Sequence, residues 1–454
     1  MLRAWTHSVW RAATALAVVM IMGSSTTAQA ASGSETQATL DMFDQLQLER
    51  EALRILAMPA MQRAMKDAQG VLRDSWQSKT ADGAARLDLA VHGFAMAAIE
   101  NTIQDDPYRP RIMWIITQPH DWYGQSWPGS MWGGHNPDNF SRDVMIDDVS
   151  TYEIEGRRTG PGPAQATFLV YSSFIGAAPQ NPEGAEIIGT LQDKDLIVDK
   201  DGYFRITVGP GEGAPGENHL KTGPGAKVLK MRNALEDWDH QLPYRLRIRR
   251  IAGPPAPPPR TDEKIAADAA ALLKVQIDFW LTYLNARAGA ADNTTRPLQG
   301  RAGGWGYISG GRFKLKDDEA LVVTIDPLSA GYFGFQLNDD WMVPPDYINH
   351  LAGVNRSQAK PNPDGTYTYV IAAHDPGVWN WVDTVGLHEG GYVLRWQRMG
   401  DQNAPVDKAV RQTELVKLAD LKRVLPAGTA WVDAGARKAQ IEGRVKAFWK
   451  RVEN

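Results

Sequence analysis

Residues of the types used for acid–base and anion chemistry gather in one stretch near the C-terminal end of the sequence. This stretch contains His374, Asp383 and, after a glycine-rich turn, Arg395. A carboxylate or an imidazole can act as a general base, and arginine can hold an oxyanionic group through two parallel N–H donors. The pattern predicts a catalytic pocket in which Asp383 or His374 removes a proton while Arg395 binds the anionic group.

Tryptophan and asparagine side chains close to this stretch are expected to line the same pocket, because indole rings stack on flat apolar ligands. The expected ligand-binding residues here are Trp341, Trp379, Asn380 and Trp381. A structural alternative explains the same residues. In it, Arg395 pairs with Asp383 across a hairpin, Asn380 closes a turn, and the tryptophans fill the interior of a sandwich.

A second polar stretch lies between strands expected at 111–117 and 150–157 and is rich in Trp, Gly, His and Asn. It is longer than an inert connection usually is. One hypothesis makes it a ligand-binding loop whose functional residues are Trp132, His135, Asp138, Asn139 and Arg142. In the alternative, residues 136–138 form a turn that bonds its own backbone, and the tryptophans are plugs. Both interpretations remain open.

The stretch with the expected catalytic residues has a looser copy at residues 198–238. Each copy opens with Asp-Gly, a pair that suits a tight hairpin turn. An alternating strand follows, then a Gly/Pro loop with Asn218 or Asn380, and then a second strand that ends at Arg232 or Arg395. The spacing from the glycine to the arginine is the same in both copies. A tandem duplication of an antiparallel domain explains this repeat.

The elements that position these residues indicate an α+β chain that is mainly β, with two antiparallel jelly-roll-like or sandwich domains. Helices are expected from Ala38 to about Ala68, from Ala84 to Ile103 and after Thr261, whereas residues 293–311 read as a flexible glycine-rich loop. The expected parts are a signal peptide (1–30), a helical N-terminal segment (31–110), a first β domain (111–250), a Pro-rich linker (251–260), a linking helix (261–290), a second β domain (291–415) and a C-terminal helical segment (416–454).

The first residues have the features of a secretory signal. Arg3 and Arg11 form a positive end before the apolar run 12–22, and Ala28-Gln29-Ala30 is a small-residue cleavage site. Removal after Ala30 predicts a periplasmic or secreted protein with no stable membrane insertion; an uncleaved anchor is the alternative. The sequence has no cysteine, which excludes disulfides and thiolate chemistry.

Composition narrows the class of partner. The 454 residues are 43% hydrophobic and 22% charged, with a net charge of -4, as in an ordinary soluble globular protein. A mildly acidic chain without a basic stripe argues against nucleic acid as a partner. The glycine-rich segment at 293–311 lacks the spacing of a phosphate-binding loop, so no nucleotide cofactor is expected. No motif specifies a metal or an oligomeric state.

Two motifs, GYFGFQLNDDW at 331–341 and NPDGTYTYVIAAHDPGVWNWVDT at 362–384, resemble a bacterial family catalogued as domain of unknown function 1214. The resemblance covers roughly Trp114 to the C-terminus. It implies antiparallel jelly-roll-like β domains, often paired in one chain, and frequent secretion. It implies no catalytic residues, and the alanine-rich N-terminal part departs from the family pattern.

These observations predict an exported protein that binds a small, partly apolar organic molecule or a sugar in a tryptophan-lined cleft. A cofactor-independent hydrolase or lyase is one form of this prediction. The alternative is a non-catalytic ligand- or protein-binding β-sandwich module. An enzyme requires a buried ionisable group within hydrogen-bond reach of the ligand, and a binding module does not.

Overall fold

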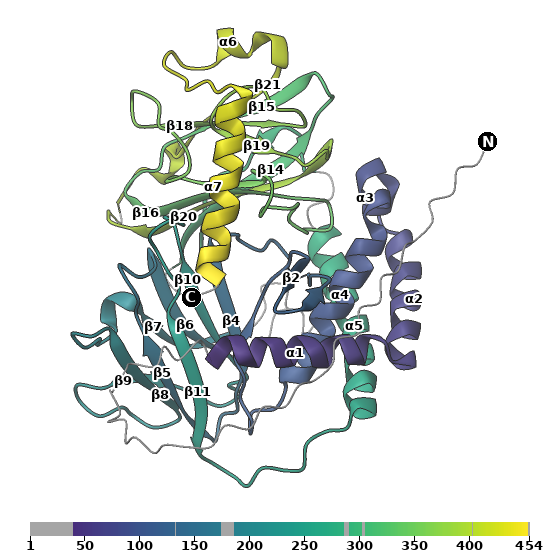
Figure 1. The fold of residues 1–454 in the computed structure, drawn as a ribbon, viewed down its shortest axis with the longest axis vertical. Coiled ribbons are helices and arrows are strands. Elements are labelled where there is room, and N and C mark those ends of the chain that lie inside the picture. The colour runs from purple at the N-terminus through teal and green to yellow at the C-terminus, as the bar shows by residue number, and fades with distance from the viewer. Residues whose placement is uncertain are drawn as a thin grey trace, which may run out of the picture. The chain divides into compact units, whose positions relative to one another are not determined.

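The computed structural model describes residues 40–131, 133–173, 186–285, 290–301, 305–401 and 403–452. Within these ranges the strands form two β-sandwiches, accompanied by N-terminal helices, a linking helix and a C-terminal helix (Figure 1). The predicted mainly β member of the α+β class is therefore confirmed. The predicted signal peptide and Trp132 lie outside the described residues.

The helical part is a bundle beside the sandwiches (Figure 1). Its members are α1 (Leu40–Leu56), α2 (Pro59–Arg73), α3 (Ala81–Ala85), α4 (Leu87–Gln104), α5 (Asp262–Asn285) and the short 3-10 turn η1 (Gln77–Lys79). The prediction of one helix from Ala38 to about Ala68 is wrong. Met58 has extended backbone angles before Pro59, because the proline ring disfavours a helical conformation in the preceding residue.

The first sandwich encloses a core that includes Tyr152, Phe168 and Ile206. One sheet has the order β1 (Met113–Trp114), β4 (Asn139–Met145), β10 (Val228–Ala234), β6 (Gln165–Tyr171), β7 (Ile187–Gln192). The other has the order β11 (Arg245–Ala252), β5 (Thr151–Arg157), β8 (Tyr203–Gly209), β9 (Asn218–Lys221). The polar stretch before β4 contains a separate hairpin, β2 (His120–Trp122) and β3 (Gln125–Trp127).

The second sandwich encloses Phe333, Tyr369 and Trp396. Its first sheet has the order β12 (Thr294–Thr295), β14 (Gly306–Lys314), β20 (Glu389–Met399), β16 (Ala330–Asn338), β17 (Gly353–Asn355), with β13 (Gln299–Arg301) also paired to β14. Its second sheet has the order β19 (Trp381–Asp383), β18 (Tyr367–Ala372), β15 (Glu319–Ile325), β21 (Val410–Lys417).

The segment expected as a flexible glycine-rich loop instead contains β12, β13 and the start of β14. Gly306 and Gly310 have positive φ, and a Cβ atom at either would lie 2.1 Å from a backbone oxygen of β20. These glycines permit the close approach of two strands. A glycine-rich segment can therefore form strands as well as a loop.

The two sandwiches share one strand order, as a tandem duplication predicts. β4, β10, β6 and β7 occupy the places that β14, β20, β16 and β17 occupy in the second sandwich, and β5, β8, β9 and β11 correspond to β15, β18, β19 and β21. Both copies contain one parallel pair, β8 with β9 and β18 with β19.

Asn218 and Asn380 make the same three hydrogen bonds in their two sandwiches. The side-chain oxygen of Asn380 accepts from the Lys360 backbone N–H at 2.7 Å, and its nitrogen donates to the Lys360 and Thr368 carbonyls at 2.8 and 3.0 Å. Asn218 bonds Ile197 in both directions at 2.7 and 2.8 Å and donates to the Arg205 carbonyl at 3.0 Å. The recurring asparagine thus joins a loop to a strand.

Replacing either asparagine by alanine is expected to lower the free energy of unfolding by about 1–3 kcal/mol, because buried backbone groups lose their partners. Urea unfolding of Asn218→Ala and Asn380→Ala checks this, with exposed Asn403→Ala as a matched control that should stay close to wild type. Unchanged stability in both buried-site variants would refute the conclusion that these asparagines stabilise the fold by joining a loop to a strand.

The C-terminal part contains α6 (Leu421–Val424) and α7 (Ala434–Val452). Helix α7 carries Arg437, Arg444 and Arg451 on one face, and all three are buried. The Arg451 guanidinium lies 3.6 Å from the centre of the Trp238 ring, so α7 packs against the first sandwich through cation–π contacts.

Candidate functional site

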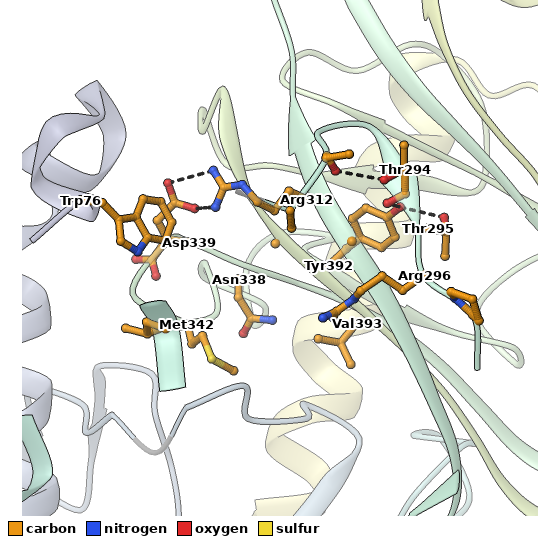
Figure 2. Close-up of a pocket in the computed structure, with 17 residues that line it drawn as sticks. Trp76, Thr294, Thr295, Arg296, Arg312, Asn338, Asp339, Met342, Tyr392 and Val393 are labelled. Carbon is orange, nitrogen blue, oxygen red and sulfur yellow. Dashed lines mark hydrogen bonds and ion pairs between the residues drawn. The ribbon is translucent and has the colours of Figure 1, made fainter. Parts of the chain in front are cut away.

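A cavity with a volume of about 380 Å³ lies on the outer face of the β14–β20–β16 sheet and is called the main cavity (Figure 2). Helix α5 contributes Leu284 and the segment after α2 contributes Trp76. The lining residues are Trp76, Leu284, Ala290, Ala291, Thr294, Thr295, Arg296, Pro297, Gly311, Arg312, Asn338, Asp339, Asp340, Met342, Gly391, Tyr392 and Val393. Most of this wall is apolar.

The two carboxylates at one end of the main cavity are paired with arginines. Both terminal nitrogens of the Arg312 guanidinium donate hydrogen bonds to the Asp340 carboxylate. The same guanidinium lies 4.9 Å from the centre of the Trp76 ring. Asp339 accepts from Arg86 and from two backbone N–H groups of its own loop. Burial raises the pKa of Asp339, whereas Arg86 opposes that rise. Neither carboxylate is free to act as a general base.

Three polar groups of the main cavity have hydrogen-bonding capacity to spare. The side-chain oxygen of Asn338 and the indole N–H of Trp76 are buried and have no hydrogen-bond partner within the described ranges. Arg296 donates from Nε to the Gly310 carbonyl at 3.2 Å. Figure 2 shows Arg296 reaching into the cavity, with its nitrogen atoms on the side of Asn338. Buried polar atoms are normally hydrogen-bonded, so these groups are candidates for ligand contacts.

A second cavity, of about 150 Å³, contains three of the residues predicted from sequence: His135, Asn139 and Arg395. It is called the arginine pocket. Its lining residues are Ile115, Gly133, Gly134, His135, Asn136, Asn139, Ser141, Asp143, Lys230, Arg232, Arg301, Trp305, Arg395 and Gln397. They come from β4 and β10 of the first sandwich and from β13, β20 and nearby loops of the second.

His135 is half-buried and Arg395 is buried in this pocket. The His135 ring stacks on Tyr347 with the ring centres 5.8 Å apart. Burial lowers the pKa of His135 to about 3, and the charges of Arg395 and Arg451 act in the same direction. Arg395 donates to the Gln336 side-chain oxygen and, at 2.9 Å, to the Gly134 carbonyl. Its partners are therefore neutral, and the hairpin pairing with Asp383 does not form.

Asp138 and Arg142 have other surroundings. Asp138 is buried and accepts hydrogen bonds from Trp238, Tyr332 and Asn355 at 2.7, 2.7 and 2.8 Å. Arg142 donates to Asn233 and to the Tyr244 carbonyl inside the first sandwich. Both side chains hold the fold together at these positions.

The expected catalytic residues lie apart. His374 is exposed and lies 3.6 Å from Asp317, whereas Asp383 is buried and accepts a hydrogen bond from His350 at 2.8 Å. Asp383 ends β19 in one sheet of the second sandwich, and Arg395 lies on β20 in the other. The structure therefore does not bring the three residues into one pocket. Arg395 lies in the other sheet, and His374, although it follows the strand paired with β19, is exposed beside Asp317.

Three of the tryptophans expected to line a cleft bond their indole N–H groups to backbone carbonyls. Trp341 and Trp381 are buried, and their indole N–H groups donate to the Gly83 and Ala372 carbonyls at 2.9 and 3.0 Å. The Trp379 indole donates to the Gln358 carbonyl at 2.9 Å. Trp379 and Asn380 border a cavity of about 10 Å³, the space of a single water.

Sequence reasoning missed most of the residues that line the two cavities. Trp76, Arg296 and Arg312 belong to no motif and come from distant parts of the chain. Two signals were present: Asn338 lies in the motif at 331–341, and Arg232 has a repeated position in the duplicated unit. Across the described ranges no three His, Asp or Glu side chains form a metal-binding group, and no helix has the length and apolar character to cross a bilayer.

The architecture is that of two tandem β-sandwiches with a helical part. The structure is similar to the crystal structure of an uncharacterised protein from Burkholderia cenocepacia, with a TM-score of 0.66 and 23% identity, covering 82% of this chain and 100% of that one. A Vibrio parahaemolyticus protein matches at a TM-score of 0.37 and 10% identity, covering 63% and 90%. The first likeness shows the fold alone. No protein-family model and no curated protein matches the sequence.

Proposed function

We propose that this protein is exported and binds a small, partly apolar organic molecule in the main cavity. The observation that carries the proposal is an apolar-walled cavity of about 380 Å³ that contains unpartnered buried polar atoms. Small-molecule sites have volumes of roughly 300–1,000 Å³, mainly apolar walls and a few placed polar groups. The main cavity has each of these features.

The polar atoms indicate the kind of ligand. The Asn338 oxygen can accept a hydrogen bond from a ligand donor such as a hydroxyl group. The Trp76 indole N–H can donate a hydrogen bond to a ligand acceptor. Arg296 adds donors from the other side of the cavity. A molecule with an apolar body and polar groups at its edges satisfies these atoms, whereas a sugar would bring hydroxyl groups against the apolar wall without partners.

Binding without chemical transformation accounts for this cavity better than catalysis does. Its described lining residues include no histidine, and its two carboxylates, Asp339 and Asp340, are held by Arg86 and Arg312. A general base must be within hydrogen-bond reach of the proton that it removes. This favours a non-catalytic binding protein over a hydrolase or lyase.

We also infer kinship with the family catalogued as domain of unknown function 1214. The support is the pair of sequence motifs, which form β16 with its following turn and the β18–β19 segment. The paired sandwiches agree with the domain organisation that the family resemblance implies. A structure-guided alignment that matched neither motif to family sequences would contradict this inference.

The proposal predicts that ligand stabilisation depends on open space in the main cavity. A thermal-shift screen of residues 31–454 against aromatic acids, phenols, sterols and sugars is expected to yield a stabilising compound. At a hundred times its dissociation constant that compound adds about 2.7 kcal/mol. Val393→Phe fills the cavity and should abolish this stabilisation while leaving the unliganded melting temperature close to wild type, because the added ring enters empty space.

Val149→Phe is the matched control, because Val149 is exposed and lies outside the cavity. It should retain the ligand response. Asn338→Leu tests the polar contact and should weaken only those compounds that carry a hydrogen-bond donor. The proposal fails if no compound class stabilises the protein, or if Val393→Phe responds like wild type.

A further inference from the structure

We propose a second binding site, for a small organic molecule that carries a carboxylate or phosphate group, in the arginine pocket between the two sandwiches. The site is separate from the main cavity and does not depend on the function proposed for it. Charge, unpartnered polar atoms and the internal duplication each support it.

The arginine pocket holds more positive than negative charge. Its described ionised residues are Lys230, Arg232, Arg301, Arg395 and Asp143. Asp143 forms an ion pair with Lys230, whose ammonium nitrogen lies 2.5 Å from both carboxylate oxygens. The remaining three arginines have no carboxylate within ion-pair distance in the described part of the chain. An excess of three positive charges therefore faces one small cavity.

Groups behind the pocket do not remove this excess. Asp138 attracts Arg395, but Arg444 and Arg451 also lie within electrostatic reach of Asp138. His135 is neutral at physiological pH, because burial holds its pKa at about 3. Tyr332 is protonated, because burial raises its pKa well above the ordinary value. The surrounding elements thus contribute one carboxylate and two further arginines.

The three arginines are placed to share a ligand. Arg395 is 7% exposed. Arg232 is half-buried and lies 4.5 Å from the centre of the Trp305 ring. Arg301 is exposed and also lines the pocket. Burial lowers the pKa of Arg395 to about 10 and nearby Arg232 adds to this, yet the guanidinium stays charged at neutral pH. A bound oxyanion would lower the cost of holding these charges together.

Unpartnered polar atoms point to a ligand independently of charge. The Trp305 indole N–H, the Asn139 oxygen and the Gln397 oxygen are all buried without a partner among the described residues. All three residues line the pocket. An amide side chain can present either its oxygen or its nitrogen to a ligand, because half a turn about its last bond exchanges the two atoms. A ligand with several oxygen atoms can therefore satisfy all three residues.

The duplication explains why two of the arginines meet. Arg232 and Arg395 occupy equivalent places on the equivalent strands β10 and β20. The outer faces of the two sheets that contain these strands both line the pocket. Each copy therefore contributes one arginine to the pocket. The volume of about 150 Å³ is that of a cavity able to hold one benzene molecule, which limits the ligand to a small carboxylic acid or phosphate.

Calorimetric titration of residues 31–454 with succinate, citrate and inorganic phosphate, at ionic strength held constant with sodium chloride, tests the site. Saturable binding of at least one anion is expected at millimolar concentration or below. Arg232→Gln and Arg395→Gln should each weaken it by about tenfold or more, because each removes a two-donor contact. Binding of succinate or citrate alone assigns a carboxylate site, and binding of phosphate alone assigns a phosphate site.

Control variants separate this site from general effects. Arg247→Gln removes one exposed charge outside the pocket and should leave anion affinity unchanged. Val393→Phe should also leave it unchanged, because that residue lines only the main cavity. Arg232→Lys keeps the charge but loses the planar fork, so an intermediate affinity is expected.

A purely structural role for the arginines has a different signature. In that case Arg232→Gln would lower the melting temperature equally with and without anion. The proposed site requires instead that the anion-induced rise in melting temperature shrinks in this variant. If Arg395→Gln does not fold, Arg232→Gln still decides the question. The proposal is overturned if none of the three anions binds saturably, or if both glutamine variants bind as well as wild type.

Discussion

Replacing Asp138 by alanine is expected to lower the free energy of unfolding by about 3–5 kcal/mol, the largest effect of any single substitution considered. The buried carboxylate accepts hydrogen bonds from Trp238 in the first sandwich and from Tyr332 and Asn355 in the second. Alanine removes the acceptor of all three donors, and of the three only the Tyr332 hydroxyl has another described partner, Asn136. It also removes a negative charge that attracts the buried guanidinium of Arg451.

Urea unfolding measures this effect. Tyr332→Phe removes only one of the donors and should cost about 1–3 kcal/mol. Asp201→Ala is the matched control, because Asp201 is exposed and its side chain pairs, within the described ranges, only with its neighbour Lys200. It should change stability by less than about 0.5 kcal/mol. A loss below about 1 kcal/mol for Asp138→Ala would contradict the assigned role of this carboxylate in joining the sandwiches.

Acidification is expected to destabilise the protein through His135. The pKa of this histidine is about 3 in the folded protein, because burial disfavours its charged form, and about 6.5 in an unfolded chain. Below pH 6.5 the unfolded chain therefore binds more protons, and stability falls as pH decreases toward 3. At pH 5 the loss from this group is about 2 kcal/mol.

His135→Phe removes this titrating group and keeps a flat ring against Tyr347. Its unfolding free energy should fall less than that of wild type between pH 7 and pH 5, as measured by urea titrations at each pH. Tyr347→Phe is the control. Burial raises the pKa of Tyr347 to about 12, so its phenol stays protonated throughout this range. Equal acid sensitivity of wild type and His135→Phe would show that His135 is not buried in neutral form.

Alternation of apolar residues located many of the strands. The alternating strand expected after the Asp-Gly pair of the looser copy is β8. The period-two pattern works here because β8 buries every second residue, Phe204, Ile206 and Val208, in the core of the first sandwich. The same reasoning failed at 293–311, where glycines serve close strand approach, and at Pro59, where one residue interrupts an otherwise helical pattern.

The tryptophans show the limit of composition as a guide to function. Trp341, Trp379 and Trp381 were expected to line a ligand cleft, yet their indole N–H groups donate to backbone carbonyls. An indole ring suits a core as well as a binding site, and its residue type does not decide between them. The tryptophan of the main cavity, Trp76, lies in a segment without any motif.

The sequence by itself determined the mainly β class, the repeated unit and the equivalence of Arg232 and Arg395. These features depend on local periodicity and on spacing within each copy, both of which are readable along the chain. Only the tertiary structure decided that these two arginines share a pocket, and that His374, Asp383 and Arg395 do not. Which side chains meet depends on how the faces of separate sheets pack, and that packing joins residues far apart in the sequence.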